Sequence, residues 1–263
     1  SVTRSFALDA ARHLGVAGRY PRCFGWPDRW GSWCLTAIPR GLALIRRQRP
    51  QVLWATFPIA SAVLIGLELA RRTGLPLVCD LRDPMSEPEF PEDPRVRRIY
   101  RRLEQRAVAG ARRVIFTAPG ALEMYRQRYP EVPARHWQVI GNGYDEEDFE
   151  IAGKRTPPIE RAAGRTELLH SGLIYPVERD PRPLLAAIAE LKKTGAVAGG
   201  SLRVTLRASG HDAELRPMID AAGVAGIVCL APPLPYHEAL AEMMRADGLL
   251  LLQAANCNQQ IPA

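Results

Sequence analysis

The chain has 263 residues, of which 47% are hydrophobic and 24% are charged. This length fits one large α/β domain or two small ones, and the apolar content suffices for a packed core, which excludes a disordered chain. No window reaches about 18 uninterrupted apolar residues, so no transmembrane helix is predicted. Five cysteines without a Cys-x-x-Cys pair argue against a disulfide framework or zinc ribbon, and favour a reducing, cytoplasmic setting.

The net charge of +7 is unevenly distributed along the sequence. Residues 1–149 contain 23 basic and 16 acidic side chains, whereas residues 150–263 contain 12 of each. We therefore expect the first half, and not the second, to attract anionic surfaces.

Apolar runs of strand length alternate with helical periodicity through the first half. Helical spacing is seen at 5–14 and 35–47, strands are predicted at 52–57, 75–81, 114–117 and 137–140, and further helices at 59–72, 96–109 and 119–128. Strands separated by helices imply right-handed βαβ units and a parallel sheet. Thr117 is predicted to be the N-cap of the helix that starts at Pro119.

The second half repeats this scheme. Strands are predicted at 168–174, 202–208, 227–230 and 248–253, and helices at 183–193, 213–222 and 237–245. The polar, proline-bearing stretch 151–165 has little periodicity and predicts a linker. The predicted fold is thus two Rossmann-like parallel-sheet domains facing a cleft, at 1–150 and 166–263. Because about four strands are visible in each and the first methionine is Met85, we expect a fragment with both domains incomplete.

The turn after the strand at 137–140 contains Asn142-Gly143, followed by an acidic cluster and Phe149. Asparagine and glycine tolerate a positive φ, so an ordinary strand-turn exit is one interpretation. The stretch also resembles the segment that closes the first domain of glycosyltransferases with the GT-B fold, of the family 4 kind. The resemblance implies that Thr117, Asn142 and Gly143 lie at the cleft or hinge.

The strand starting at Leu168 is interrupted by Gly172, and Arg179 and Arg182 follow it. A glycine at a strand end lets a ligand approach the backbone, and an arginine there could hold a pyrophosphate. This stretch resembles the opening of the family's donor-binding domain, which implies that Gly172 lines the donor phosphates and that Arg179 neutralises them. The family usually has Lys-Gly where this chain has Pro181-Arg182, so both arginines stay candidates. Solvated arginines beside a strand-end glycine are the alternative.

The stretches 229–240 and 246–253 resemble the later part of the same domain. The resemblance implies backbone contacts with the nucleotide base from Leu230 to Pro232, and places Asn258 in a donor-site loop. The glutamate-bearing helix that grips the donor ribose in the family would lie beyond Ala263.

Asp80-Leu81-Arg82-Asp83 follows a predicted buried strand and resembles the family's acceptor-side Asp-x-Arg-Asp. Carboxylates three residues apart could point into the cleft, and Asp83 could accept a hydrogen bond from an acceptor hydroxyl. A loop-capping aspartate with an arginine partner is the alternative. Because Asp-x-Asp spacing is lacking, neither a phosphatase pair nor a metal-binding transferase site fits. We predict no metal and no cofactor.

The stretch 95–113 combines an apolar stripe with repeated arginines and predicts a one-sided helix. A solvated face is the default, and a peripheral contact with an anionic membrane is the functional alternative. Nucleic acid is not expected, because no aromatic residues interleave the basic ones.

Together these stretches predict transfer of a sugar from a nucleoside diphosphate to a hydroxyl of a carbohydrate or lipid-linked acceptor, with retention and without a metal. We expect a role in cell-envelope polysaccharide biosynthesis, in the cytoplasm or at the inner face of the membrane. A nucleotide-sugar epimerase of the same fold and a non-catalytic binding module are the alternatives. The chain as given is expected to be inactive, because half of the donor pocket would be missing.

Overall fold

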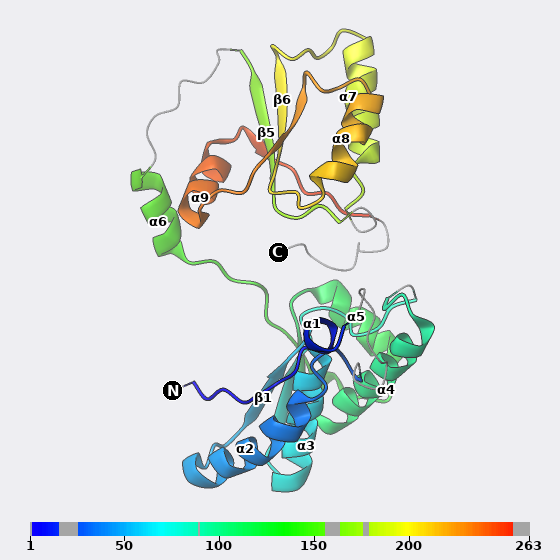
Figure 1. The fold of residues 1–263 in the computed structure, drawn as a ribbon, viewed down its shortest axis with the longest axis vertical. Coiled ribbons are helices and arrows are strands. Elements are labelled where there is room, and N and C mark those ends of the chain that lie inside the picture. Colours follow the sequence, from blue (N-terminus) through cyan, green and yellow to red (C-terminus); the bar gives the residue numbers. More distant parts are fainter. Residues whose placement is uncertain (1, 16–25, 89, 156–163, 176–178, 255–263) are drawn as a thin grey trace. The chain divides into compact units, whose positions relative to one another are not determined.

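The computed structural model describes residues 2–15, 26–88, 90–155, 164–175 and 179–254. They form two compact units that divide between Asn142 and Gly143 (Figure 1). Each unit contains a four-stranded sheet in which every pairing is parallel. The predicted class, two parallel-sheet α/β units, is confirmed.

The first unit has the sheet order β1-β2-β3-β4. Its strands are β1 (Leu53–Thr56), β2 (Leu77–Asp80), β3 (Arg113–Phe116) and β4 (Trp137–Val139). Its described helices are α1 (Ala10–His13), α2 (Trp33–Gln48), α3 (Ala60–Thr73), α4 (Pro94–Gly110), α5 (Pro119–Arg128) and the short 3-10 helix η2 (Ala134–His136).

Each crossover in the first unit advances by one strand in the same direction. Right-handed connections therefore place α3, α4 and α5 on a single face of the sheet. The strands alternate accordingly, because Leu77 and Cys79 are buried while Val78 and Asp80 are only half-buried. Gly66 lets α3 approach the sheet closely, since a Cβ there would lie 2.7 Å from the Ala55 Cβ. The core of this unit lies between this face and these helices.

The second unit has the sheet order β7-β6-β5-β8. Its strands are β5 (Thr166–Ser171), β6 (Leu202–Arg207), β7 (Val228–Ala231) and β8 (Gly248–Leu249). Its described helices are α6 (Glu146–Arg155), α7 (Arg182–Lys193), α8 (Asp212–Ala221) and α9 (Tyr236–Arg245).

The chain reverses its direction across the second sheet. From β5 it advances to β6 and β7, and then returns past them to place β8 on the other side of β5. Right-handed crossovers then require α7 and α8 on one face and α9 on the opposite face, which Figure 1 shows. Val204 and Leu206 belong to the core under α7 and α8, whereas Arg207 faces Glu242 of α9.

The boundary between the units differs from the prediction, which ended the first domain at residue 150 and began a linker at 151. Residues 146–155 form α6, which belongs to the second unit. Three acidic residues in its first turn favour helix formation there. Ala152 of α6 is fully buried against Leu240 and Ala241 of α9, and Asp148 accepts a hydrogen bond from His237 at 3.0 Å.

Every strand and helix predicted from residue 52 onward has a counterpart, although several are trimmed at their ends, and the first helix and the last strand of the chain are less than half as long as predicted. The helix predicted at 5–14 is reduced to α1, because Asp9 caps it by accepting hydrogen bonds from the backbone N–H groups of Ala11 and Arg12. The last strand pairs only over Gly248–Leu249, after which Leu250 and Leu252 pack against the core. No helix within the described ranges is long and apolar enough to span a bilayer.

Candidate functional site

The carboxyl ends of parallel strands share one edge of a sheet, and open α/β sheets bind ligands there, where the strand order reverses. In the second unit this reversal lies between β5 and β8. The loop that follows β5 begins with Gly172, so this residue lies at the topological switch point of the sheet.

Gly172 has a backbone conformation that other residues rarely adopt. Its φ is +137°, and a Cβ built there would meet no heavy atom within 4 Å. Its N–H donates to the carbonyl of Arg207 at 3.0 Å, and the N–H of Ile174 donates to the carbonyl of Ser209 at 2.9 Å. The backbone after β5 is therefore fixed against the end of β6, and Gly172 leaves open space above it.

Arg179 and Arg182, the two candidate phosphate ligands, have different surroundings. The Arg179 guanidinium donates to the carbonyl of Leu173 at 2.9 Å and lies 5.9 Å from the centre of the Tyr175 ring, so it is held against the loop that Gly172 opens. Arg182 instead pairs with Asp180 at 2.7 Å, its side chain is 72% exposed, and this pairing lowers the pKa of Asp180. Only Arg179 is positioned beside the Gly172 loop.

The predicted base-contacting backbone, Leu230 to Pro232, lies at the end of β7. The carbonyl of Pro232 accepts a hydrogen bond from Arg207 at 2.8 Å, and the same guanidinium binds the Glu242 carboxylate at 2.8 Å. Arg207 was not a sequence candidate, although an arginine at a strand's carboxyl end is a recognisable signal. Asn258 lies outside the described residues.

In the first unit, two predicted site residues, Thr117 and Asn142, both contact Arg82 at the carboxyl edge of the sheet. The Arg82 guanidinium donates to Oδ1 of Asn142 at 2.6 Å, and the Thr117 hydroxyl donates to the carbonyl of Arg82 at 2.9 Å. The prediction that Thr117 caps α5 is wrong, because Ala118 occupies the N-cap position and this hydroxyl is bound elsewhere. Gly143, which follows Asn142, has no heavy atom within 4 Å of the position that a Cβ would occupy.

Asp80 and Asp83, predicted to leave the strand together, differ in environment. Asp80 is half-buried at the end of β2, where burial raises its pKa and the Arg82 charge opposes that shift. Asp83 is exposed in the loop that follows. Of the two carboxylates, Asp83 is therefore the one open to a ligand from solvent.

Within the described ranges, no group of three or more His, Cys, Asp or Glu side chains could hold a metal ion.

The family model described as "Glycosyl transferase 4-like domain" matches residues 3–143, which is the first unit almost to the residue. This chain belongs to that family. A comparison with curated protein sequences finds no match.

Solved structures share the GT-B fold of this glycosyl transferase 4-like chain. HepE from Anabaena, crystallised with UDP, is 17% identical over 82% of this chain and 57% of its own, with a TM-score of 0.56. Sucrose-phosphate synthase from Thermosynechococcus elongatus is 13% identical over 81% and 53%, with a TM-score of 0.58. Trehalose 6-phosphate synthase from Burkholderia multivorans is 12% identical over 89% and 56%, with a TM-score of 0.61. This chain thus spans little more than half the length of these neighbours.

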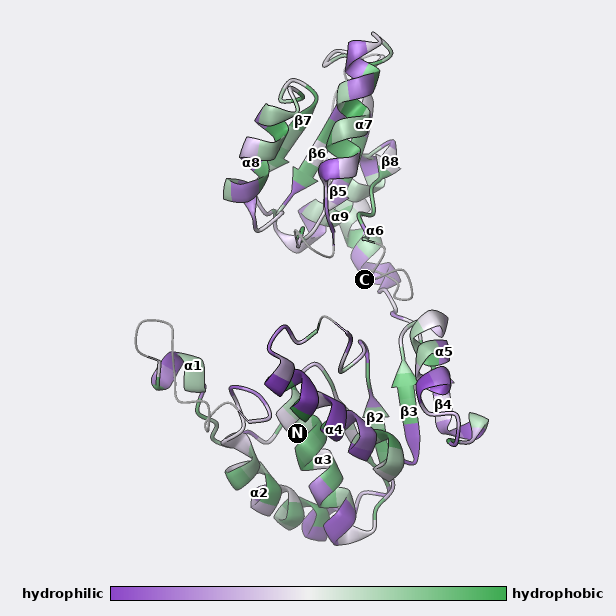
Figure 2. Cartoon of the chain, turned by 90° about the vertical axis from the view of Figure 1, so that its right-hand side faces the viewer, coloured by the Kyte–Doolittle hydropathy of each residue, from purple (hydrophilic) through white to green (hydrophobic). Residues whose placement is uncertain are grey.

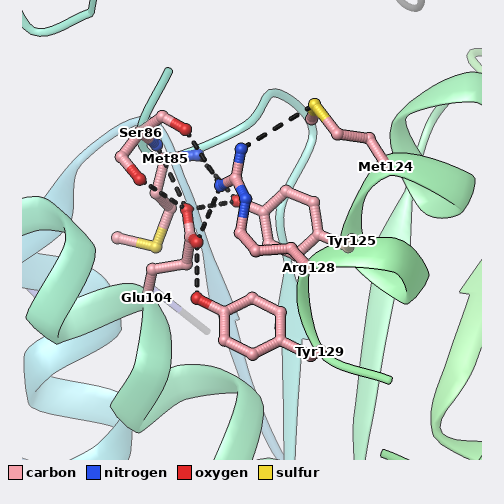
Figure 3. A network of polar contacts seen from close by, with 7 residues as sticks. All are labelled: Met85, Ser86, Glu104, Met124, Tyr125, Arg128 and Tyr129. Carbon is pink, nitrogen blue, oxygen red and sulfur yellow. Dashed lines mark hydrogen bonds and ion pairs between the residues drawn. The ribbon is translucent and has the colours of Figure 1, made fainter. Parts of the chain in front are cut away.

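A buried carboxylate holds the loop that carries Asp83 in the glycosyl transferase 4-like unit (Figure 3). Glu104 of α4 is fully buried, and its Oε2 accepts hydrogen bonds from the Ser86 N–H at 3.2 Å, the Ser86 hydroxyl at 3.0 Å and the Tyr125 hydroxyl at 2.7 Å. Its Oε1 accepts from Arg128 at 2.8 Å and Tyr129 at 2.6 Å.

The same network ties three elements together. Tyr125 accepts a hydrogen bond from the Met85 N–H at 2.9 Å, and Arg128 donates to the carbonyl of Ser86 at 2.9 Å. Burial first, and Glu104 second, raise the pKa of the Tyr125 and Tyr129 hydroxyls, which therefore remain donors at neutral pH. The loop after β2 is thus anchored to both α4 and α5.

Sequence reasoning missed Glu104, although a signal was present. It stands next to Leu103 and three residues before Ala107, on the side of the helix that the apolar stripe marks as buried. An acid on that side must find donors, because burying an unpaired charge is costly.

We predict that Glu104→Ala lowers the free energy of unfolding by about 3–5 kcal/mol, because it leaves the Arg128 charge and the hydroxyls of Ser86, Tyr125 and Tyr129 without their acceptor. Denaturant unfolding followed by circular dichroism measures the change. The matched control is Glu123→Ala on α5, whose carboxylate is 53% exposed and pairs with Arg126 at 3.3 Å. The control should change stability by less than about 1 kcal/mol. Similar effects of both substitutions would contradict the role of the network.

The burial of Glu87 leads us to expect that the stability of the first unit depends on pH. Its Oε1 is buried without a partner, and burial raises its pKa, with Arg128 opposing and Glu104 adding to the shift. A carboxyl group whose pKa is higher in the folded than in the unfolded chain destabilises the fold. This cost grows as the pH rises above the pKa in the unfolded chain, which is about 4.3.

We therefore expect Glu87→Gln to gain stability over the parent chain as the pH is raised from about 4 to about 7. Thermal unfolding across this range measures the difference, with Glu131→Gln, at an exposed position, as the control. A Glu87→Gln variant that follows the parent at every pH would refute the account.

Proposed function

We propose that this chain is part of an enzyme that transfers a sugar from a nucleoside diphosphate to a hydroxyl of a carbohydrate or lipid-linked acceptor. The observation that carries the proposal is the conjunction of Gly172 and Arg179 at the switch point of the second sheet. HepE, which shares the fold, was crystallised with UDP and with UDP-glucose, and this supports a nucleotide sugar as the donor.

Charge on the leaving diphosphate has to be stabilised as the sugar departs. In this proposal Arg179 supplies the positive charge, and the open backbone at Gly172 admits the phosphates. The N-terminus of α7 contributes little to this stabilisation, because Asp180 already accepts a hydrogen bond from the Arg182 N–H at 3.0 Å and Pro183 has no N–H. Neutralisation by arginine supports a reaction that needs no metal.

The first unit would hold the acceptor at the edge formed by Arg82, Thr117 and Asn142. Asp83 is the exposed carboxylate at this edge, and in this proposal it accepts a hydrogen bond from the acceptor hydroxyl. The bond from Arg82 to the Asn142 side chain fixes the arginine, and the Thr117 hydroxyl fixes the Arg82 carbonyl. The retaining outcome follows from the family resemblance, and the anomeric configuration of the product, read by NMR, tests it.

A cytoplasmic role in cell-envelope polysaccharide biosynthesis belongs to the same proposal. The free thiols of Cys34, Cys79 and Cys229 support a reducing setting. An epimerase would convert the nucleotide sugar without any acceptor, so product analysis with and without acceptor separates the two reactions. A binding module would bind the nucleotide and form neither product.

Nucleotide binding by the full chain tests the donor site. We expect Arg179→Ala to weaken UDP affinity about tenfold or more in calorimetric titrations, because a charge-assisted hydrogen bond contributes roughly 1.5–3 kcal/mol. The control Arg182→Ala removes an equal charge that is already paired with Asp180, and it should change affinity by less than about threefold. Equal losses in both variants, or unchanged affinity in Arg179→Ala, would reject the role given to Arg179. Titrations with ADP and GDP identify the base.

Removal of divalent cations tests the metal-free mechanism. We expect the UDP affinity of the chain to be the same in EDTA as in Mg²⁺, because the phosphate charge would be met by Arg179. Affinity that is lost in EDTA and restored by Mg²⁺ would contradict this mechanism.

A further inference from the structure

Helix α4 presents a basic face that the transfer reaction does not use. It buries Leu103, Ala107 and Val108 against the core. Five arginines on the other side are exposed; this α4 arginine face consists of Arg95, Arg98, Arg101, Arg102 and Arg106. At about 100° per residue they fall on a single arc of the helix. Figure 2 shows α4 as a strongly hydrophilic helix at the surface of the first unit.

Several arginines elsewhere in the chain have acidic partners, and those of the α4 arginine face differ from them. Arg71 and Arg72 bind Glu68, and Arg207 binds Glu242. Among the described residues, no acidic side chain pairs with any member of the α4 arginine face. Arg98, Arg102 and Arg106 follow one another at four-residue spacing, where like charges destabilise a helix. A partner that brings negative charge would relieve this repulsion.

An exposed aromatic residue adjoins the same helix. Phe90 is 46% exposed in the loop before α4. Arg97 holds this loop on the helix, because its guanidinium donates to the carbonyls of Pro91 at 2.9 Å and Glu92 at 3.1 Å. Asp93 accepts a hydrogen bond from the Arg95 N–H at 2.8 Å and so caps the helix end.

We propose that the α4 arginine face binds the surface of an anionic lipid bilayer, with Phe90 entering the interfacial layer. Arg95 and Arg106 are separated by roughly 16 Å of helix at 1.5 Å per residue, so the face meets several headgroups at once. Clusters of four to eight basic side chains on an amphipathic helix are typical of anionic lipid binding. One adjoining aromatic side chain suits a bilayer interface better than a nucleic acid, which needs a series of stacking rings.

Co-sedimentation of the full chain with vesicles tests the proposal. We expect binding to vesicles of phosphatidylcholine mixed with phosphatidylglycerol, weak binding to phosphatidylcholine alone, and loss of binding at high salt. The triple variant R98Q/R102Q/R106Q should bind the anionic vesicles about 100-fold more weakly, at about fivefold per charge. Adding Phe90→Ser should weaken binding to the anionic vesicles further. It should leave the salt dependence of that binding unchanged.

The matched control is R46Q/R47Q/R216Q, which removes three exposed arginines from α2 and α8. Circular dichroism confirms that both triple variants are folded. Loss of binding in the α4 variant alone supports the proposal, whereas equal losses in both variants overturn it in favour of diffuse charge. Equal affinity for neutral and anionic vesicles also overturns it. So does binding of a duplex DNA oligonucleotide, with no binding to either vesicle, in the same buffer.

Discussion

Parallel strands can be joined only by crossovers, and these crossovers have one hand, which fixes where the loops of both sheets can lie. In the first unit the strands follow one another in order, so α3, α4 and α5 share a face and the loops after β2, β3 and β4 become neighbours at one edge. In the second unit the return to β8 reverses the direction, moves α9 to the opposite face, and creates the switch point beside Gly172. The two candidate edges follow from this single geometric constraint.

The edge proposed to hold the acceptor also needs a fixed loop after β2, and the network around the buried Glu104 fixes that loop. A carboxylate inside a core is tolerated only when donors surround it, and Glu104 has five hydrogen bonds from Ser86, Tyr125, Arg128 and Tyr129. Because Ser86 belongs to the loop, while Tyr125 and Arg128 lie on α5 and Tyr129 directly follows it, these bonds fix the loop relative to the sheet. Asp83 is three residues from Ser86, so its position depends on this anchor.

Helix α4 has two sides of very different chemistry. Its buried side contributes Glu104 and the apolar packing that complete the first unit. Its exposed side carries the α4 arginine face. The packing of the first unit does not require the number or the spacing of these arginines. An enzyme acting on a lipid-linked acceptor would gain from such a face, because binding at the bilayer surface raises the local concentration of acceptor.

The sequence by itself determined the alternation of strands and helices, because burial on parallel sheets imposes apolar runs and helical stripes that are local in the chain. It also marked Gly172 as a special backbone position, since a glycine interrupting an apolar strand is a local signal, and its φ of +137° accounts for it. The stretches that resemble the glycosyltransferase family are also local in the chain, and they predicted the GT-B fold.

Only the tertiary structure decided which side chains meet. Arg82 and Asn142 are 60 residues apart, and Glu104 and Tyr129 are 25 apart, so their hydrogen bonds depend on the order of strands in the sheet. The structure likewise separated Arg179, held at Leu173, from Arg182, paired with Asp180. It also showed that the first residues of the predicted linker belong to α6, because Ala152 is buried against Leu240 and Ala241 of α9, almost ninety residues later in the chain.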